Sequence, residues 1–476
     1  MKQLLSIRVT VIIFLCIVLC NKTWAENKAS DAQHSSSTPG IVEIPLNING
    51  LDTQLIEKDE KAPFFPSRAK ASANPMPEHA FEKTETCAGC HQEIYSQWQN
   101  SVMAKSWEDP IYRSLLEMAS KATNGAIDNF CIGCHTPIGL TTGNAVAVGQ
   151  DKAHSPGVDC ESCHNMSASN GNGNGAYVLT PKKYGRPLKF GPRSDAQSPY
   201  HDTAYSELHT KSEFCATCHN VTHPFNQLAV ERTYDEWRDS IYNAQGIECQ
   251  DCHMKPEAKM VKSAIMGKER ESVASHYFSG GNSTLHTHFG NEGMAEKARE
   301  MLRSSAKMEI TETQLGNYSL RTKIRVTNIG AGHKLPTGFP EGREIWIDYQ
   351  VKDANGKTIY RLGQVKDGHT EKGTKNFKAV LGDKNNQEVD INVWEADRIL
   401  SDTRILPMGH MDVEYVSEIE HNDISFPLTI TADLYYWPFS QYLVDKIVGP
   451  NKIKVEIVKL TQVSTTIFQE QNLATH

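Results

Sequence analysis

The sequence predicts two domains of different class: a mainly helical N-terminal domain with little regular structure, and a C-terminal all-β antiparallel sandwich of the immunoglobulin-like type. The first prediction rests on the pentapeptide C-x-x-C-H, which occurs five times between Cys87 and Met254 as CAGCH, CIGCH, CESCH, CATCH and CQDCH. The second rests on the chain after Met308, where no cysteine follows and apolar residues alternate with polar ones. That alternation is the period of half-buried strands.

Each C-x-x-C-H motif is typical of a covalently attached haem. Its two thiols can add to the two vinyl groups of a haem, and the histidine that follows then binds the iron as proximal ligand. A thioredoxin-like pair does not repeat five times, and neither zinc sites nor disulfide frameworks need a histidine after every second cysteine. We therefore expect five haem c groups and a haem-dominated domain. The predicted sites are Cys87 and Cys90 with His91, Cys131 and Cys134 with His135, Cys160 and Cys163 with His164, Cys215 and Cys218 with His219, and Cys249 and Cys252 with His253.

The N-terminus has the features of an export signal. A charged n-region precedes an apolar h-region, Val9 to Leu19, and Ala25 ends a small-residue cleavage site. We expect cleavage near Ala25 to remove residues 1–25 with Cys16 and Cys20, and a lipoprotein site at Cys20 remains an alternative. No later run is apolar and long enough to cross a bilayer. The mature chain is therefore expected in the periplasm, outside the cell or on the cell surface of a bacterium.

The remaining chain divides into three parts. Residues 26–80 are polar or Pro-containing and lack helical periodicity, so we expect a flexible or extended arm that lies over the surface of its own subunit or a neighbour. Within it, Ile41 to Ile48 is a candidate short strand. Residues 81–306 form the pentahaem domain, which a helix over Glu292 to Ser305 closes. The β-sandwich domain takes residues 307–476.

Two patterns predict local structure inside these domains. In the haem domain a tyrosine, a tryptophan and a valine or isoleucine recur at i, i+3 and i+7, which places them on one face of a helix against porphyrin edges or core. The two copies are Tyr95, Trp98 and Val102, and Tyr234, Trp237 and Ile241. In the β domain, the alternating runs are 320–326, 345–351, 358–360, 411–415, 428–434 and 453–457.

The second axial ligands of the irons are sought among the eight histidines that lie outside the motifs between His79 and His288, of which five irons need at most five. His223 follows His219 by four residues, so on a helix both would share a face and His223 would serve a neighbouring haem. His154 and His209 each precede the first cysteine of a motif by six residues. The favoured ligands are His201, His209, His223 and His276, followed by His154 and His79, and the other two histidines are His286 and His288.

The haem domain resembles the multihaem cytochromes c related to the tetrahaem cytochrome of bacterial ammonia oxidation. Residues 81–290 carry the resemblance, in ETCAGCHQEIYSQWQNSVMAKSW, NFCIGCHTPIG, GVDCESCHNM, SEFCATCHNV and GIECQDCHM. It implies electron transfer. It also implies that GAGHKLPTGFPEGREIWIDYQV, with His333, belongs to a β-domain that accompanies such haem domains.

Met103 lies where related sequences often have a ligating histidine. The resemblance makes it a candidate thioether ligand, and twelve residues of helix would separate it from His91 by about 18 Å, so it would serve a different iron. The alternative is packing beside a large ring, which Tyr242 at the same place of the second repeat favours.

Three classes of function follow. The net charge of −8 disfavours a nucleic-acid binder. The first hypothesis is an exported electron carrier whose redox partners are other cytochromes or quinol-linked complexes. The second is a multihaem reductase or oxidase of small nitrogen or sulfur compounds, which needs one iron with an open position. The third is a subunit that self-associates into an assembly or filament.

Overall fold

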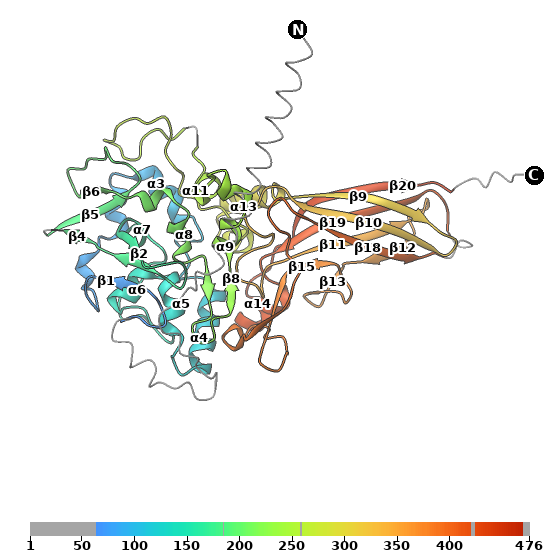
Figure 1. Ribbon diagram of the computed structural model, residues 1–476, viewed down its shortest axis with the longest axis horizontal. Helices are drawn as coiled ribbons and strands as arrows, with labels where there is room; N and C mark the ends of the chain where they lie inside the picture. The colour runs from blue at the N-terminus through green and yellow to red at the C-terminus, as the bar shows by residue number, and fades with distance from the viewer. Residues whose placement is uncertain (1–62, 184, 258, 420–423, 470–476) are drawn as a thin grey trace, which may run out of the picture. The chain divides into compact units, whose positions relative to one another are not determined.

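The computed structural model describes residues 63–183, 185–257, 259–419 and 424–469. All of them belong to one compact unit, Leu46–His476. Figure 1 shows short helices in the part of this unit that carries the C-x-x-C-H motifs, and long strands in its C-terminal part. We call residues 63–305 the motif region and residues 306–469 the β region. The predicted signal sequence and the candidate strand at Ile41 to Ile48 lie outside the described residues.

The motif region is built of short helices and small sheets, as the prediction of a mainly helical part expected. Its longest helix has 13 residues. The helices are η4 (Glu78–Ala80), α2 (Thr84–Ala88), α3 (Gln92–Gln99), α4 (Pro110–Ala122), α5 (Asp128–His135), α6 (Pro137–Thr142), α7 (Cys160–His164), η5 (Glu207–Thr210), α8 (Glu213–Ala216), α9 (Thr233–Arg238), α10 (Ile241–Ala244), α11 (Cys249–His253), α12 (Ser283–His288) and α13 (Glu292–Arg303). The strands are β1 (Lys70–Ala71), β2 (Met166–Ser169), β3 (Tyr177–Leu179), β4 (Lys182–Lys183), β5 (Arg186–Gly191), β6 (Asp202–Tyr205), β7 (Val221–Thr222) and β8 (Ala229–Glu231).

The described end of the expected arm is packed rather than flexible. Phe64 is 4% exposed and Ala69 is 1% exposed, and both belong to a hydrophobic cluster with Leu116 and Tyr177. The expectation of an arm over the surface therefore does not hold for residues 63–80. Their apolar side chains are too sparse for a periodic pattern, yet they fill space between the helices.

The repeated aromatic pairs each lie on a helix that ends sooner than predicted. Tyr95 and Trp98 lie on α3 with ring centroids 5.7 Å apart, and Tyr234 and Trp237 lie on α9 with centroids 5.6 Å apart. A serine then stops each helix, because its hydroxyl accepts a hydrogen bond from a backbone N–H of the turn that follows. The third position of each repeat, Val102 or Ile241, therefore lies beyond the helix, and the prediction of one continuous face is wrong there.

The β region contains two larger antiparallel sheets. The first has the order β18-β10-β9, and the second has the order β12-β11-β19-β20 with β15 beside β11. Their strands are β9 (Ala306–Leu315), β10 (Ser319–Asn328), β11 (Glu344–Lys352), β12 (Thr358–Leu362), β15 (Asn376–Phe377), β18 (His410–Glu418), β19 (Leu428–Trp437) and β20 (Val458–Ile467). The shorter elements are β13 (Val365–Lys366), β14 (His369–Thr370), β16 (Ala379–Gly382), η6 (Val393–Glu395), β17 (Arg398–Asp402) and α14 (Gln441–Val448).

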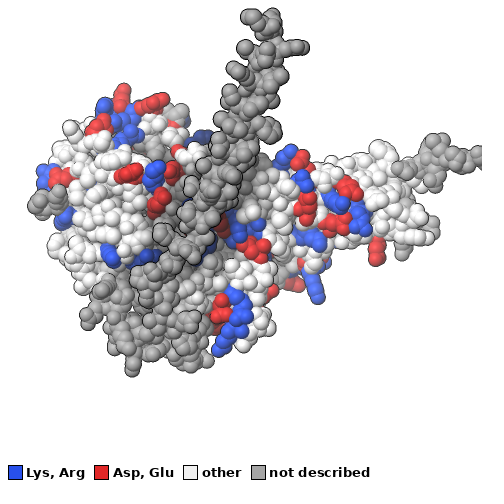
Figure 2. All heavy atoms as spheres, viewed as in Figure 1, with Lys and Arg blue, Asp and Glu red and all other residues white. Residues whose placement is uncertain are grey.

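The alternation in the sequence explains the first sheet. On β10 the side chains of Leu320, Ile324 and Val326 are fully buried. The residues between them point outward and form ion pairs across the sheet, and oppositely charged side chains lie side by side on this part of the surface (Figure 2). The pairs are Arg321 with Glu414, Lys323 with Glu312, and Arg325 with Asp412.

The two sheets contribute to one hydrophobic core. Tyr349 of β11 stacks on Tyr415 of β18 with ring centroids 4.2 Å apart, and its hydroxyl bonds to Thr322 of β10 at 2.8 Å. The same cluster contains buried side chains of β10, β11, β18, β19 and β20. The antiparallel β character of this region is confirmed, whereas its assignment to the immunoglobulin-like type stays a prediction.

One predicted strand is wrong. Residues 453–457 are not a strand, and β20 begins only at Val458. Their backbone groups bond to side chains instead: the Gln441 amide donates to the carbonyl of Ile453 and accepts from the N–H of Val455, and Thr284 accepts from Glu456. The apolar alternation at this place reflects packing against α14. No helix among the described residues is long and apolar enough to cross a membrane.

Candidate haem sites

Each C-x-x-C-H motif begins on a short helix, of four or five residues at four motifs and of eight residues, α5, at the second motif. We number the motifs one to five in chain order. In the third and fifth motifs an acidic residue, Asp159 or Glu248, caps the turn in a capping box with the residue three positions later. A cap fixes where the turn starts, and so it fixes the direction in which the two thiols and the histidine project.

A tryptophan from the aromatic repeat holds the third and fifth motifs in the same way. Trp98 Nε1 donates to the carbonyl of Val158 at 2.9 Å, and Trp237 Nε1 donates to the carbonyl of Ile247 at 2.8 Å. Both carbonyls precede the first cysteine of their motif by two residues. The repeat therefore includes the motif that follows it. The sequence shows this longer repeat as a shared tripeptide before the first cysteine: a glycine, then valine or isoleucine, then an acidic residue before Cys160 and Cys249.

Thiols of different motifs lie beside one another, which places the attachment sites close together. Burial, with Asp159 and Cys218 nearby, raises the pKa of Cys163 to about 12, so the third motif lies next to the fourth. Three further pairs of thiols are close enough to influence each other's pKa: Cys87 with Cys160, Cys134 with Cys218, and Cys215 with Cys249.

The histidines of four motifs are oriented for iron binding through Nε2. In each, Nδ1–H donates to a backbone carbonyl, which fixes the tautomer and leaves Nε2 free. Burial lowers the pKa of His135 to about 4, and it also lowers the pKa of His164 and His253, so these rings are neutral at pH 7. The bonds are His91 to Ser263 at 2.6 Å, His135 to Ser106 at 3.2 Å, His164 to Phe190 at 2.7 Å, and His253 to Ser279 at 2.6 Å. His219 of the fourth motif is exposed, and its carbonyl accepts from Tyr234 N–H.

Two motif histidines face a second imidazole at the spacing of paired iron ligands. The ring centroids of His253 and His333 are 6.4 Å apart with planes 15° apart, and those of His164 and His276 are 6.5 Å apart with planes 27° apart. With a metal–nitrogen bond of about 2.0 Å on each side, two imidazoles on one iron have centres about 6 Å apart. The donor set and its spacing therefore fit haem at the third and fifth motifs.

His333 was not among the predicted ligands. It lies in the loop after β10, outside the motif region, so no spacing relative to a cysteine points to it. Its Nδ1–H donates to the carbonyl of Lys334 at 2.9 Å, and burial lowers the pKa of His333 to about 4. The sequence feature that could have identified His333 is its position in the stretch GAGHKLPTGFPEGREIWIDYQV, to which the family resemblance points.

The structure brings some of the favoured histidines to the motifs. His276 donates through Nδ1 to Ala274 and faces His164. His201 donates through Nδ1 to Asp202 and lies near His91. His209 lies 5.7 Å from His164 between ring centroids, with Nε2 at 3.2 Å from the Cys163 carbonyl.

His223 is placed differently from its prediction. Its Nε2–H donates to the carbonyl of Trp394 at 3.1 Å, and its Nδ1 accepts from the N–H of Phe225 at 3.4 Å. Both ring nitrogens are thus used, so the structure does not present His223 as an iron ligand. It joins the motif region to the β region instead.

Among the described residues, none of the remaining candidate ligands faces a motif histidine. His79 and His154 are exposed. Met103 is half-buried, and its carbonyl accepts from Ser106 and Val158. Its ligation of an iron stays a prediction. His286, which was not favoured, is 3% exposed, and burial lowers its pKa to about 4.

Comparisons with known proteins agree with this geometry. The family described as Cytochrome c554 and c-prime matches residues 86–165, which contain the first three motifs. A solved structure, the penta-heme cytochrome c552 from Thermochromatium tepidum, is similar in fold with a TM-score of 0.59 and 21% identity, over 82% of this chain and 100% of that chain. These findings support a multihaem c-type cytochrome.

Other solved structures match only weakly. The structural genomics target SoR45 matches 36% of this chain and 89% of its own, at 11% identity and a TM-score of 0.15. A putative beta-galactosidase from Bacteroides fragilis matches 34% of this chain and 16% of its own, at 10% identity and a TM-score of 0.16. No curated protein matches the sequence. The family match and the fold similarity to the penta-heme cytochrome support covalent haem c and electron transfer, and the relation to ammonia oxidation stays a prediction.

Proposed function

We propose that this protein is an exported pentahaem c-type cytochrome that carries electrons between redox partner proteins. The observation that carries the proposal is the contact between motifs: the first meets the third, the third meets the fourth, and the fourth meets the second and the fifth. The five attachment sites therefore form one connected network that branches at the fourth motif. Bound haem would supply irons that each take up and release one electron.

The chain's own residues hold these sites rigid. Nδ1–H bonds from His91, His164 and His253 to backbone carbonyls fix the ring planes. The bonds from Trp98 and Trp237 fix the turns of the third and fifth motifs. At the third and fifth motifs two imidazoles would be available to hold one iron, which would leave no open position for a substrate there and suits a carrier.

We also propose that the β region is a sandwich of the immunoglobulin-like type that completes a haem site instead of carrying one. The shared core of its two sheets supports a sandwich, and the position of His333 opposite His253 supports the role. Cleavage near Ala25 and a periplasmic or cell-surface location are part of the proposal. They rest on the n-region, the h-region and the cleavage site.

Carbon monoxide separates this function from its alternative. An electron carrier with two axial ligands on every iron keeps its reduced absorption spectrum unchanged when carbon monoxide is added. A new carbon-monoxide band in the intact reduced protein, with saturating stoichiometry, would instead support the multihaem reductase or oxidase with one open iron. Size-exclusion measurement of the same sample tests self-association.

A further inference from the structure

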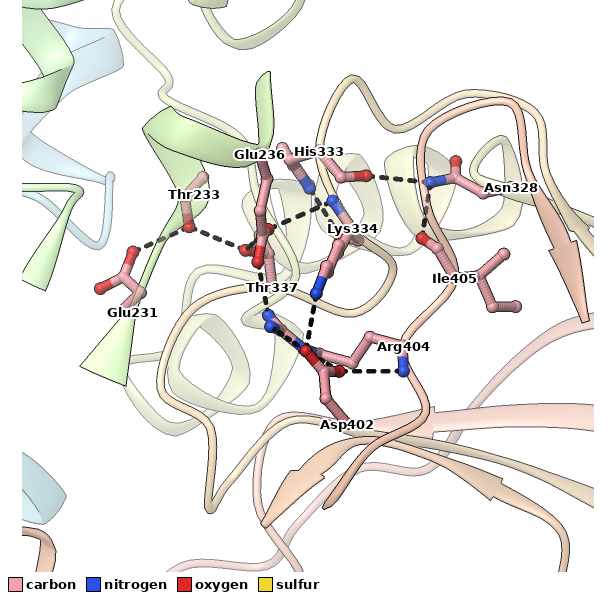
Figure 3. A network of polar contacts seen from close by, with 10 residues as sticks. All are labelled: Glu231, Thr233, Glu236, Asn328, His333, Lys334, Thr337, Asp402, Arg404 and Ile405. Carbon is pink, nitrogen blue, oxygen red and sulfur yellow. Dashed lines mark hydrogen bonds and ion pairs between the residues drawn. The ribbon is translucent and has the colours of Figure 1, made fainter. Parts of the chain in front are cut away.

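A buried polar network holds the loop that carries His333 (Figure 3). Glu236 of α9 is its centre. One carboxylate oxygen of Glu236 accepts from the backbone N–H of Lys334 at 3.2 Å and from the hydroxyl of Thr337 at 2.8 Å. Lys334 follows His333 directly, and its carbonyl accepts the Nδ1–H of His333. Glu236 thus binds the backbone of Lys334, and the carbonyl of this same residue orients the His333 imidazole.

The charge of Glu236 is matched inside the protein. Its second oxygen lies 2.8 Å from Arg404, and the two side chains are only 5% and 10% exposed. Asp402 accepts from Arg404 at 2.8 Å and from Lys334 Nζ at 2.7 Å. A buried ion pair of this kind costs desolvation and is weak evidence for stability by itself, but loss of one partner leaves a buried charge unpaired.

The residue next to Glu236 holds the other half of the same site. Trp237 bonds to the carbonyl of Ile247, two residues before the first cysteine of the fifth motif, which supplies His253. Two adjacent residues of α9 therefore contact both halves of the site. Trp237 bonds to the segment that carries His253, and Glu236 bonds to the loop that carries His333. The 6.4 Å between His253 and His333 is set across this single turn of helix.

We propose that Glu236, with Arg404, is a positioning residue that keeps His333 in place as the second axial ligand of the fifth haem. The inference rests on the proposed ligation by His333. It adds that the ligand stays bound only while the charged network across the two regions is intact. The network acts through the Lys334 peptide and touches neither the iron nor a substrate.

Variants of the full-length holoprotein test this inference. Glu236→Ala removes both hydrogen bonds and the ion pair, and Glu236→Gln keeps an acceptor but removes the charge. We expect one iron in five to become partly high-spin, to bind carbon monoxide and to titrate at a higher potential, because it loses a donor ligand. The alanine variant should show a larger high-spin fraction than the glutamine variant. Electron paramagnetic resonance and a redox titration measure these effects.

The matched control is Glu456→Gln. Glu456 forms an ion pair with Arg299 at 2.7 Å between the same two regions but does not contact the loop of His333. The spectrum and the haem potentials of Glu456→Gln should therefore equal those of the wild type. An equal high-spin signal in Glu456→Gln would mean general loosening and would overturn the inference. If the Glu236 variants remain low-spin while His333→Ala gains a high-spin iron, the positioning role is wrong and the ligation stands. If His333→Ala also remains unchanged, the ligation itself is wrong.

Discussion

His223 donates its Nε2–H to the backbone carbonyl of Trp394, 3.1 Å away in the β region. Both groups are removed from water, since His223 is 2% exposed. A histidine that the sequence offers as an iron ligand is therefore a structural contact between two regions, and this difference can be tested directly.

His223→Ala should leave all haem bands unchanged while it destabilises the protein. The carbonyl of Trp394 would lose its partner, and an unsatisfied buried polar group costs about 1–3 kcal/mol. Denaturant unfolding followed by absorption measures both effects, with exposed His79→Ala as control. A new carbon-monoxide band in His223→Ala would show that His223 is a ligand after all.

His276→Ala should have the opposite signature. It removes the imidazole that faces His164 at 6.5 Å, so one iron in five should become high-spin, bind carbon monoxide and shift to higher potential. His288→Ala is the control, because His288 is exposed on α12. A His276→Ala protein with five low-spin irons would refute the pairing.

Trp98→Phe and Trp237→Phe should each destabilise the protein by about 1 kcal/mol, the usual loss of a hydrogen bond. Both variants keep an aromatic ring but lose the N–H that bonds to Val158 or Ile247. Thermal unfolding of the two variants compares the copies of the repeat. A neutral result at either position would show that this bond does not hold the motif that follows.

Glu341→Gln should change how stability depends on pH. Burial raises the pKa of Glu341 from 4.5 to about 7, although the N–H of Leu381 donates to it. The folded state thus holds a proton that the unfolded state releases between pH 4.5 and 7, and stability falls as the pH rises through this window. Glutamine does not titrate. The free energy of unfolding of the variant, relative to that of the wild type, should therefore rise by about 3 kcal/mol between pH 4.5 and pH 8.

The measurement is denaturant unfolding of both proteins at pH 5 and pH 8. The difference between variant and wild type isolates Glu341, because all other titrating groups are shared. A difference that stays constant with pH would mean that the Glu341 carboxyl titrates normally in the folded state.

The sequence predicted the features that depend on local pattern. Alternation predicted β10, β11, β18 and β19. The C-x-x-C-H spacing also predicts the attachment sites, and these stay a prediction. Alternation was wrong at residues 453–457, because burial against α14 creates the same alternation as a strand. Periodicity reports burial, and backbone partners decide whether a strand forms.

Pairings between distant segments could not be predicted in this way. His333 is 80 residues from His253 in the sequence, and only tertiary structure brings them together. The helical and β regions also share a core in which Ile111 and Leu285 pack with Trp346 and Trp437. The pattern of apolar and polar residues within one helix or strand does not indicate which distant segment that helix or strand will contact.

Intact-mass measurement of the mature protein, from a host that can attach haem c, counts the haem groups on the chain. We expect the mass of the polypeptide plus five haem units, and peptide mapping should assign one haem to each C-x-x-C-H motif. A mass with four haem units or fewer, or a motif that retains two free thiols, would contradict this expectation.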